Sequence, residues 1–420
     1  MSDDAFAALA AELGAGATPS GVEVLKRNRA RVIARAGDAL VKVYLARPAT
    51  AAREARALAR ARQLGLSAPE PLAAGADWTA TRWLDDARPA ARADLPLLLR
   101  AVTRAHERGM LHGDLHLGNL LVRDGGVTFL DLQRARFLPW LPETLRRREL
   151  GFLAYSLGEP LPPELAHVRF WRDRRARTHW RSRTRRCLQE SGDFTAFAHG
   201  REAGFARRKV DGTKLSAALD SVAGVTPFKR SDGGELWRTG AWVVKRFASA
   251  RAARAAWLGG NGLEARAVST CTPLAWAGPW LVMADGGPTL SDWVDGEFAK
   301  STAFERDELA HALGSLLAKL HRRGIYHADL KANNVVWRPG EEPRLLDYGR
   351  VTFGSRVTRR RRVKNLAQLN AALPDLVPAA LRERALAVYL AESATGDEPA
   401  ALQRDVVSAS LRRAHRWHGC

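Results

Sequence analysis

The 420-residue sequence has few cysteines and no long apolar run. Its three cysteines, Cys187, Cys271 and Cys420, are an odd number without paired spacing, so we expect reduced thiols rather than disulfides or a zinc site. No segment approaches the roughly 18 consecutive apolar residues that a membrane-spanning helix needs. The first ten residues are acidic and lack the basic opening of a signal peptide. These absences predict a cytoplasmic protein.

The sequence is also short of acid relative to base. Lys and Arg number 66 against 45 Asp and Glu, which gives a formal net charge of +21. A GC-rich genome can explain why arginine outnumbers lysine, but it does not explain the excess of base over acid. Charge of this size bears on partners rather than on fold, and it predicts an anionic partner.

One pattern occurs twice in the chain. Residues 111–119 read LHGDLHLGN and residues 326–334 read YHADLKANN, and both have the form H-x-D-L-x-x-x-N. A second carboxylate follows each copy, Asp131 twelve residues after Asn119 and Asp347 thirteen residues after Asn334. Asp and Asn are common turn residues, which is the alternative explanation. We favour a functional one because the four-part spacing recurs between an amphipathic helix and an apolar strand.

These residue types suit phosphoryl transfer, in which the protein mainly positions groups and neutralises charge. One Asp must accept the proton of the attacking hydroxyl, while an Asn and a second Asp supply hard oxygen ligands for Mg²⁺ on the ATP phosphates. We therefore predict Asp114 and Asp329 as the catalytic bases. The predicted metal ligands form two pairs: Asn119 with Asp131, and Asn334 with Asp347.

At these residues the chain resembles the protein-kinase-like superfamily, which includes small-molecule kinases. HGDLHLGNLLV is similar to the catalytic loop of aminoglycoside and choline phosphotransferases, and LDLQRAR to the metal-binding segment of lipopolysaccharide-core heptose kinases. YHADLKANNVV is similar to the loop of the Kdo kinases that act on lipid A. The resemblance covers most of both halves, is strong in the catalytic loops, and is weak in the nucleotide-covering loops.

The resemblance implies an α+β fold of two tandem protein-kinase-like domains, each a small β-rich lobe over a helical lobe with ATP in the cleft. We expect the first domain at residues 18–168, a basic Arg-rich linker at 169–190 and the second domain at 191–420. In the family, a strand lysine pairs with the ATP phosphates and with a glutamate on the following helix. Lys42 and Glu54 stand in these places in the first half, and Lys245 is the strand lysine of the second.

Alternation along the strand of Lys42 predicts which side chains face the core. Lys42 and Tyr44 lie on the other face. An exposed strand lysine and a solvated helix glutamate are the alternative interpretations of Lys42 and Glu54. The predicted core-facing residues are Val41, Val43 and Leu45.

The nucleotide-covering turns differ between the halves. No G-x-G-x-x-G precedes Lys42, so the first half must use a plain turn such as RNRAR (27–31), which fits the small-molecule branch better than protein kinases. The second half has SDGG (231–234). Its helix places Ala256 opposite Glu54, which leaves Glu264 as the candidate partner of Lys245.

Lys331 matches a lysine that meets the transferred phosphate in protein kinases, and we predict a catalytic role for it; the first half has His116 there.

Two basic features lie outside the loops. Residues 145–162 match 358–375, and their arginine-rich starts are predicted near the clefts, with a solvated charged face as the alternative. Residues 169–186 hold nine arginines interleaved with Phe170, Trp171 and Trp180. Such a segment suits nucleic acid, but it equally suits phosphorylated glycolipids and an anionic membrane surface, which the catalytic loops favour. A solvated linker helix is the remaining alternative.

The sequence thus predicts a kinase that uses ATP and Mg²⁺ to phosphorylate a sugar hydroxyl of a lipopolysaccharide-core-like glycolipid at the inner membrane face. Its expected partners are an anionic glycolipid or phosphorylated sugar and, peripherally, an anionic membrane, with nucleic acid less favoured. One alternative is a soluble acceptor of the aminoglycoside or choline type, although such cations call for an acidic pocket. The others are a protein kinase and a scaffold with one pseudokinase half.

Overall fold

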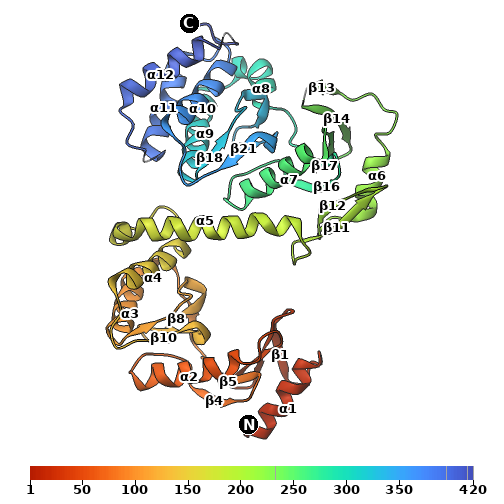
Figure 1. Ribbon diagram of the computed structural model, residues 1–420. Coiled ribbons are helices and arrows are strands. Elements are labelled where there is room, and N and C mark those ends of the chain that lie inside the picture. The colour runs from red at the N-terminus through yellow and green to blue at the C-terminus, as the bar shows by residue number, and fades with distance from the viewer. Residues whose placement is uncertain (232, 394, 414, 420) are drawn as a thin grey trace. The chain divides into compact units, whose positions relative to one another are not determined.

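The structure is a computed structural model that describes residues 1–231, 233–393, 395–413 and 415–419, so Asp232 of the SDGG turn and Cys420 lie outside the described residues. The chain divides into two compact units, Met1–Arg177 and Thr178–Cys420. The division falls within helix α5 (Arg169–Arg185), which Figure 1 draws as one long helix. Both units combine helices with antiparallel sheets, which confirms the predicted mixed α and β architecture.

The first unit starts with helix α1 (Asp3–Gly14) and a five-stranded sheet of order β1-β2-β3-β5-β4. Four residues that precede the expected domain start at residue 18 belong to this unit's packed core: Phe6, Leu9, Ala10 and Leu13. The sheet strands are β1 (Val22–Arg27), β2 (Arg31–Ala36), β3 (Ala39–Tyr44), β4 (Pro71–Ala74) and β5 (Trp78–Arg82). The other elements are α2 (Thr50–Gln63), β6 (Arg88–Pro89), α3 (Leu95–Glu107), β7 (Met110–Leu111), β8 (Leu120–Arg123), β9 (Gly126–Phe129), β10 (Arg136–Phe137) and α4 (Glu143–Ser156).

The two faces of this sheet have different environments. Val41 and Val43 of β3 pack in one cluster with Leu13 of α1, because α1 buries its apolar stripe on this face. Lys42 and Tyr44 lie on the opposite face, as alternation predicts, and both contact α2. The prediction for Leu45 is wrong: it is 41% exposed, because β3 ends at Tyr44.

The second unit contains a seven-stranded antiparallel sheet of order β11-β12-β16-β17-β15-β14-β13. Its strands are β11 (Phe194–His199), β12 (Glu202–Arg207), β13 (Lys229–Ser231), β14 (Gly234–Thr239), β15 (Trp242–Arg246), β16 (Pro273–Ala277) and β17 (Trp280–Ala284), and the short strands β18 (Ile325–His327), β19 (Val335–Val336), β20 (Arg344–Leu345) and β21 (Val351–Phe353) follow. Its helices are α6 (Gly212–Asp220), α7 (Ala250–Glu264), α8 (Leu290–Gly296), α9 (Ala303–Arg322), α10 (Arg359–Ala372), α11 (Ala379–Ser393) and α12 (Pro399–Leu411).

Helix α7 approaches the backbone after Asp347 closely, and glycine makes this possible. A Cβ on Gly259 would lie 2.2 Å from the carbonyl oxygen of Tyr348, and one on Gly260 would lie 2.9 Å from the Pro273 ring. Because backbone atoms cannot yield as a flexible side chain does, these glycines set the distance between α7 and the segment that carries Asp347.

We predict that Gly259→Ala destabilises the second unit by about 1–3 kcal/mol, since the added methyl overpacks a backbone contact. Gly296→Ala is the matched control, because a Cβ there meets no atom within 4 Å. Chemical denaturation followed by tryptophan fluorescence measures both. Equal stability of the two variants would contradict the close packing of α7.

Candidate active site

The two catalytic-loop motifs fold with the same hydrogen bonds. In the first unit, Asn119 Nδ2 donates to the Asp114 carbonyl at 3.0 Å, and the Leu130 amide donates to the Asn119 carbonyl at 2.9 Å. In the second, Asn334 Nδ2 donates to the Asp329 carbonyl at 2.8 Å, and the Leu346 amide to the Asn334 carbonyl at 2.9 Å. Each Asn is thereby fixed between the base and the second Asp predicted for its cleft.

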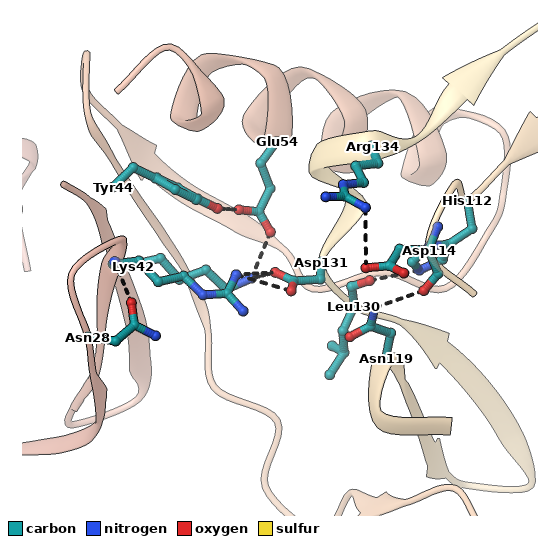
Figure 2. Close-up of polar contacts among 11 residues, drawn as sticks. Asn28, Lys42, Tyr44, Glu54, His112, Asp114, Asn119, Leu130, Asp131 and Arg134 are labelled. Atoms are coloured by element: carbon teal, nitrogen blue, oxygen red, sulfur yellow. Dashed lines mark hydrogen bonds and ion pairs between the residues drawn. The ribbon is translucent and has the colours of Figure 1, made fainter. Parts of the chain in front are cut away.

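A buried histidine braces each loop. The Asp114 amide donates to His112 Nδ1 at 3.3 Å, so Nε2 carries the proton that bonds the Leu130 carbonyl at 2.9 Å (Figure 2). His327 makes the equivalent contacts with the Asp329 amide and the Leu346 carbonyl, at 3.3 and 3.4 Å. Burial lowers the pKa of both histidines, so they stay neutral and structural.

Lys42 forms the centre of the first site. Its Nζ lies 2.7 Å from Glu54 Oε1 and 2.7 Å from Asp131 Oδ1, while Tyr44 donates its hydroxyl proton to Glu54 Oε2 (Figure 2). Lys42 is only 8% exposed. Burial alone would lower its pKa, but Glu54 and Asp131 outweigh this effect and raise the pKa above the ordinary 10.5. Lys42 and Glu54 are thus buried and paired rather than solvated.

Asp131 is held in an unusual conformation and by two cations. Its backbone is left-handed, with φ at +57°, as is that of Asp347 at +49°. Such strain in a residue other than glycine concentrates at functional sites. Arg31 Nη1 lies 3.2 Å from Asp131 Oδ2, in addition to the contact from Lys42. Desolvation raises the pKa of Asp131, but Lys42 and Arg31 together bring it down to about 2.

The second site keeps the lysine and changes its surroundings. Lys245 Nζ lies 3.0 Å from Asp347 Oδ1 and 4.6 Å from the centre of the Phe247 ring. Lys245 lines a cavity of about 150 Å³, and Ala256 and Asn334 line it too. The suggestion that Glu264 replaces Glu54 is wrong, because Glu264 forms an ion pair with Arg207 and accepts a hydrogen bond from Thr270.

The two predicted bases, Asp114 and Asp329, have different cationic neighbours. Lys331 Nζ lies 3.1 Å from Asp329 Oδ2, so the structure brings this predicted pair together. At Asp114 the neighbours are arginines, with Arg175 Nη2 at 3.6 Å from Oδ1 and Arg134 Nη1 at 3.9 Å from Oδ2. Neither arginine was predicted as a site residue from the sequence. Arg134 lies three residues after Asp131, but Arg175 comes from α5, and its approach to Asp114 has no local sequence signal.

Helices α4 and α10 each contact a loop or the helix before it. The residues that make these contacts do not align as the sequence match predicted. Glu149 of α4 bonds the Gly113 amide at 2.7 Å and His106 Nε2 at 2.9 Å. In the second unit it is Asn365 of α10 that contacts His321 Nε2, at 3.4 Å. Glu149 therefore corresponds to Asn365, three residues beyond the position given by matching residues 145–162 to 358–375.

The Arg-rich segment is helical and much of it serves contacts within the chain. Arg172 pairs with Glu159 at 3.1 Å, and Arg183 pairs with Asp193 at 3.5 Å. Trp180 carries the guanidinium of Arg266 on its ring. Phe170, by contrast, is 62% exposed.

The predicted metal ligands are hard oxygen donors. Among the described residues, no three or more His, Cys, Asp or Glu side chains are grouped to hold a metal ion on their own. Mg²⁺ at phosphoryl-transfer sites takes one or two protein ligands and completes its shell with phosphate and water. The pairs Asn119 with Asp131 and Asn334 with Asp347 fit that requirement.

Two segments of the chain match families of phosphate-transferring enzymes. Residues 287–389 match the lipopolysaccharide kinase (Kdo/WaaP) family, and residues 74–167 match the phosphotransferase enzyme family. These matches confirm the resemblance and the enzyme class: the chain is a kinase. They imply ATP as a substrate, and the first family implies a sugar or glycolipid acceptor.

Two solved structures show a distant likeness to the chain. A choline/ethanolamine kinase family protein from Mesorhizobium loti aligns with 18% identity and a TM-score of 0.30 over 42% of this chain and 79% of its own. The bifunctional kinase-methyltransferase WbdD aligns with 17% identity and a TM-score of 0.30 over 43% of this chain and 47% of its own. No curated protein matches the chain.

We predict that Glu54→Gln lowers the unfolding free energy of the first unit by about 3 kcal/mol, because it leaves a buried ammonium with one partner fewer. Since the pKa of Lys42 is raised, this stabilisation is fully present below about pH 10.5 and is lost as the pH rises through the folded-state pKa. Glu143→Gln is the control, because its pair with Arg147 is exposed to solvent, which screens the charges, so we expect little loss of stability. Denaturation at pH 7 compares the variants, and equal losses would contradict the central role of Lys42.

Proposed function

We propose that the chain is an ATP- and Mg²⁺-dependent kinase that phosphorylates a sugar hydroxyl on an anionic, lipopolysaccharide-core-like glycolipid at the inner membrane face. The observation that carries this proposal is the set of contacts around Asp131 and Asp114. Asp131 pairs with the buried Lys42, and Arg134 and Arg175 approach Asp114. One end of the site is thus suited to nucleotide phosphates and the other to an anionic acceptor.

In the proposed reaction, the acceptor oxygen forms a bond to the γ-phosphorus while the bond from that phosphorus to the bridging oxygen of ADP breaks. Asp114 takes the proton of the acceptor hydroxyl. Lys42, positioned by Glu54, binds the nucleotide phosphates. Asn119 and Asp131 would hold Mg²⁺, which neutralises charge on the phosphates.

We further propose that the chain has two tandem kinase-like domains, one within each unit, at residues 18–168 and 191–420. The matching hydrogen bonds of the two loops support this arrangement. In the second cleft, Asp329 is the proposed base, Lys331 contacts the transferred phosphate, and Lys245 binds ATP. Asn334 and Asp347 would be the metal ligands there.

Two features support the proposed location at a membrane: the glycolipid acceptor and the positive charge of the chain. The net charge of +21 favours an anionic lipid surface, and exposed Phe170 on the arginine-rich α5 suits peripheral contact with it. In the described residues, no helix is both long and apolar enough to span a bilayer. Nucleic acid remains the less favoured anionic partner.

A specific observation favours a second candidate, in which the second unit is a nucleotide-binding scaffold with slow or no turnover. Phe247 and Ala256 stand where the first unit has Tyr44 and Glu54, so Lys245 has one carboxylate to position it instead of two. The presence of Asp329, Lys331 and Asn334 favours activity. Separate inactivation of each cleft decides between the two.

We predict that Asp114→Asn and Asp329→Asn, made singly in the full-length chain, each lower turnover in their own cleft by about 10²–10⁴-fold, since each removes a general base. ATP affinity should change little. The assay is ATP turnover with glycolipid, aminoglycoside and protein acceptors. Asp124→Asn, in the exposed β8–β9 turn, is the control. Wild-type turnover in a variant that carries both substitutions would contradict both assignments. A loss of turnover with Asp114→Asn alone would favour the second unit as a scaffold.

We also predict that Arg175→Gln lowers kcat/KM about 10-fold for a phosphorylated sugar acceptor, because one charge-assisted hydrogen bond is lost. The same sugar without its phosphate should react equally well with both enzymes. Arg169→Gln, exposed on the same helix, is the control variant. A uniform loss with charged and neutral acceptors would contradict an acceptor-binding role for Arg175.

A further inference from the structure

Arg31 is fixed at the edge of the first site by the turn between β1 and β2. Asn28 Oδ1 accepts hydrogen bonds from the amides of Ala30 and Arg31, both at 2.9 Å, which orders the turn without glycine. The Arg31 guanidinium then reaches Asp131, with Nη1 at 3.3 Å from Oδ1 and 3.2 Å from Oδ2. A turn residue thus contacts the carboxylate proposed to hold metal.

The strand register places Arg31 on the same face of the sheet as Lys42. Arg31 lies opposite Tyr44, and Ile33 lies opposite Lys42. Directly opposed residues of antiparallel strands share a face. Arg31 and Lys42 therefore project from neighbouring strands toward the same carboxylate, and this arrangement follows from the sheet itself.

The contact of Arg31 with Asp131 conflicts with metal binding. Both Asp131 oxygens are within 3.3 Å of Arg31, and Oδ1 also meets Lys42. A metal ion that binds Asp131 competes with Arg31 for these oxygens and repels its charge. The triphosphate that arrives with the metal offers oxygens suited to a guanidinium fork.

We propose that Arg31 is a phosphate-binding residue, which exchanges from Asp131 to the terminal phosphate of ATP when the nucleotide and its metal bind. This inference rests on the proposed function of the first cleft. In the nucleotide-free state Arg31 neutralises Asp131, and in the bound state it neutralises phosphate. The exchange keeps each charge paired in both states.

In the second unit a glycine stands at the position equivalent to Arg31. Glu235 lies opposite Arg246, so the next pair along the strands is Gly234 with Phe247, where the first unit has Arg31 with Tyr44. Gly234 has φ at +122°, and a Cβ there would lie 2.1 Å from the Arg246 carbonyl oxygen. No side chain fits at Gly234, so this position of the second cleft cannot supply an arginine to Asp347.

The test uses the full-length chain with Asp347→Asn, which disables metal binding in the second cleft, as the parent. Calorimetry with Mg²⁺ compares ATP and ADP. We expect Arg31→Gln to weaken ATP binding about 10-fold, because a charge-assisted contact to the terminal phosphate is lost, and to change ADP binding less than about 2-fold. Arg29→Gln is the matched control, because Arg29 is exposed in the same turn and its replacement removes the same charge.

A second readout does not depend on nucleotide. The parent and its Arg31→Gln variant are titrated with Mn²⁺ in the absence of nucleotide, and electron paramagnetic resonance measures the bound metal. We expect the variant to bind Mn²⁺ more tightly, because Arg31 no longer competes for Asp131. Equal or weaker Mn²⁺ binding overturns the exchange. If Arg31→Gln melts below the assay temperature, Arg31→Lys replaces it, with a smaller loss of ATP affinity expected because the fork is lost and the charge kept.

The remaining outcomes separate this inference from the proposed function. Equal losses for ATP and ADP, or no loss for either, overturn the role of Arg31 alone, provided that the parent binds ATP. A parent that binds no ATP overturns the proposed function of the first cleft and this inference with it.

Discussion

The first unit depends on the pairing of one buried ammonium group. Lys42 is 8% exposed, and a charge so far removed from water is tolerated only with close partners. Its partners come from α2, through Glu54, and from the segment after β9, through Asp131. Because one nitrogen must reach both carboxylates at 2.7 Å, the sheet, the helix and the loop region are held in the arrangement that forms the site.

The second unit shows that the partners change as a set. Where the first unit has Tyr44 donating to Glu54, the second has Phe247 and Ala256. A tyrosine beside alanine would leave a buried hydroxyl without an acceptor, and a glutamate beside phenylalanine would leave a carboxylate with one donor fewer, and both arrangements cost free energy. The paired replacement removes both groups together and leaves Asp347 to hold Lys245.

The sequence was informative where chemistry is local and poor where it depends on distant contacts. The loop motifs were found because their residues are close in sequence and occur twice, and alternation along β3 put Lys42 on the face of Glu54. Arg175 was missed because its approach to Asp114 depends on how α5 packs. The Glu264 prediction failed because Glu264 forms an ion pair with Arg207, a residue distant in sequence whose contact no local pattern indicates. The roles of the site residues remain predictions.

Arginine serves a common purpose at both ends of the first site. Arg31 occupies Asp131, and Arg134 and Arg175 approach Asp114 at 3.9 and 3.6 Å, which is too long for strong hydrogen bonds. On the proposed function, each carboxylate is needed by an incoming reactant, and each reactant brings the negative charge that draws the arginine away. Binding would then free Asp131 for metal and Asp114 for the hydroxyl proton without leaving any charge unpaired. On this proposal, part of the chain's large positive charge serves the site.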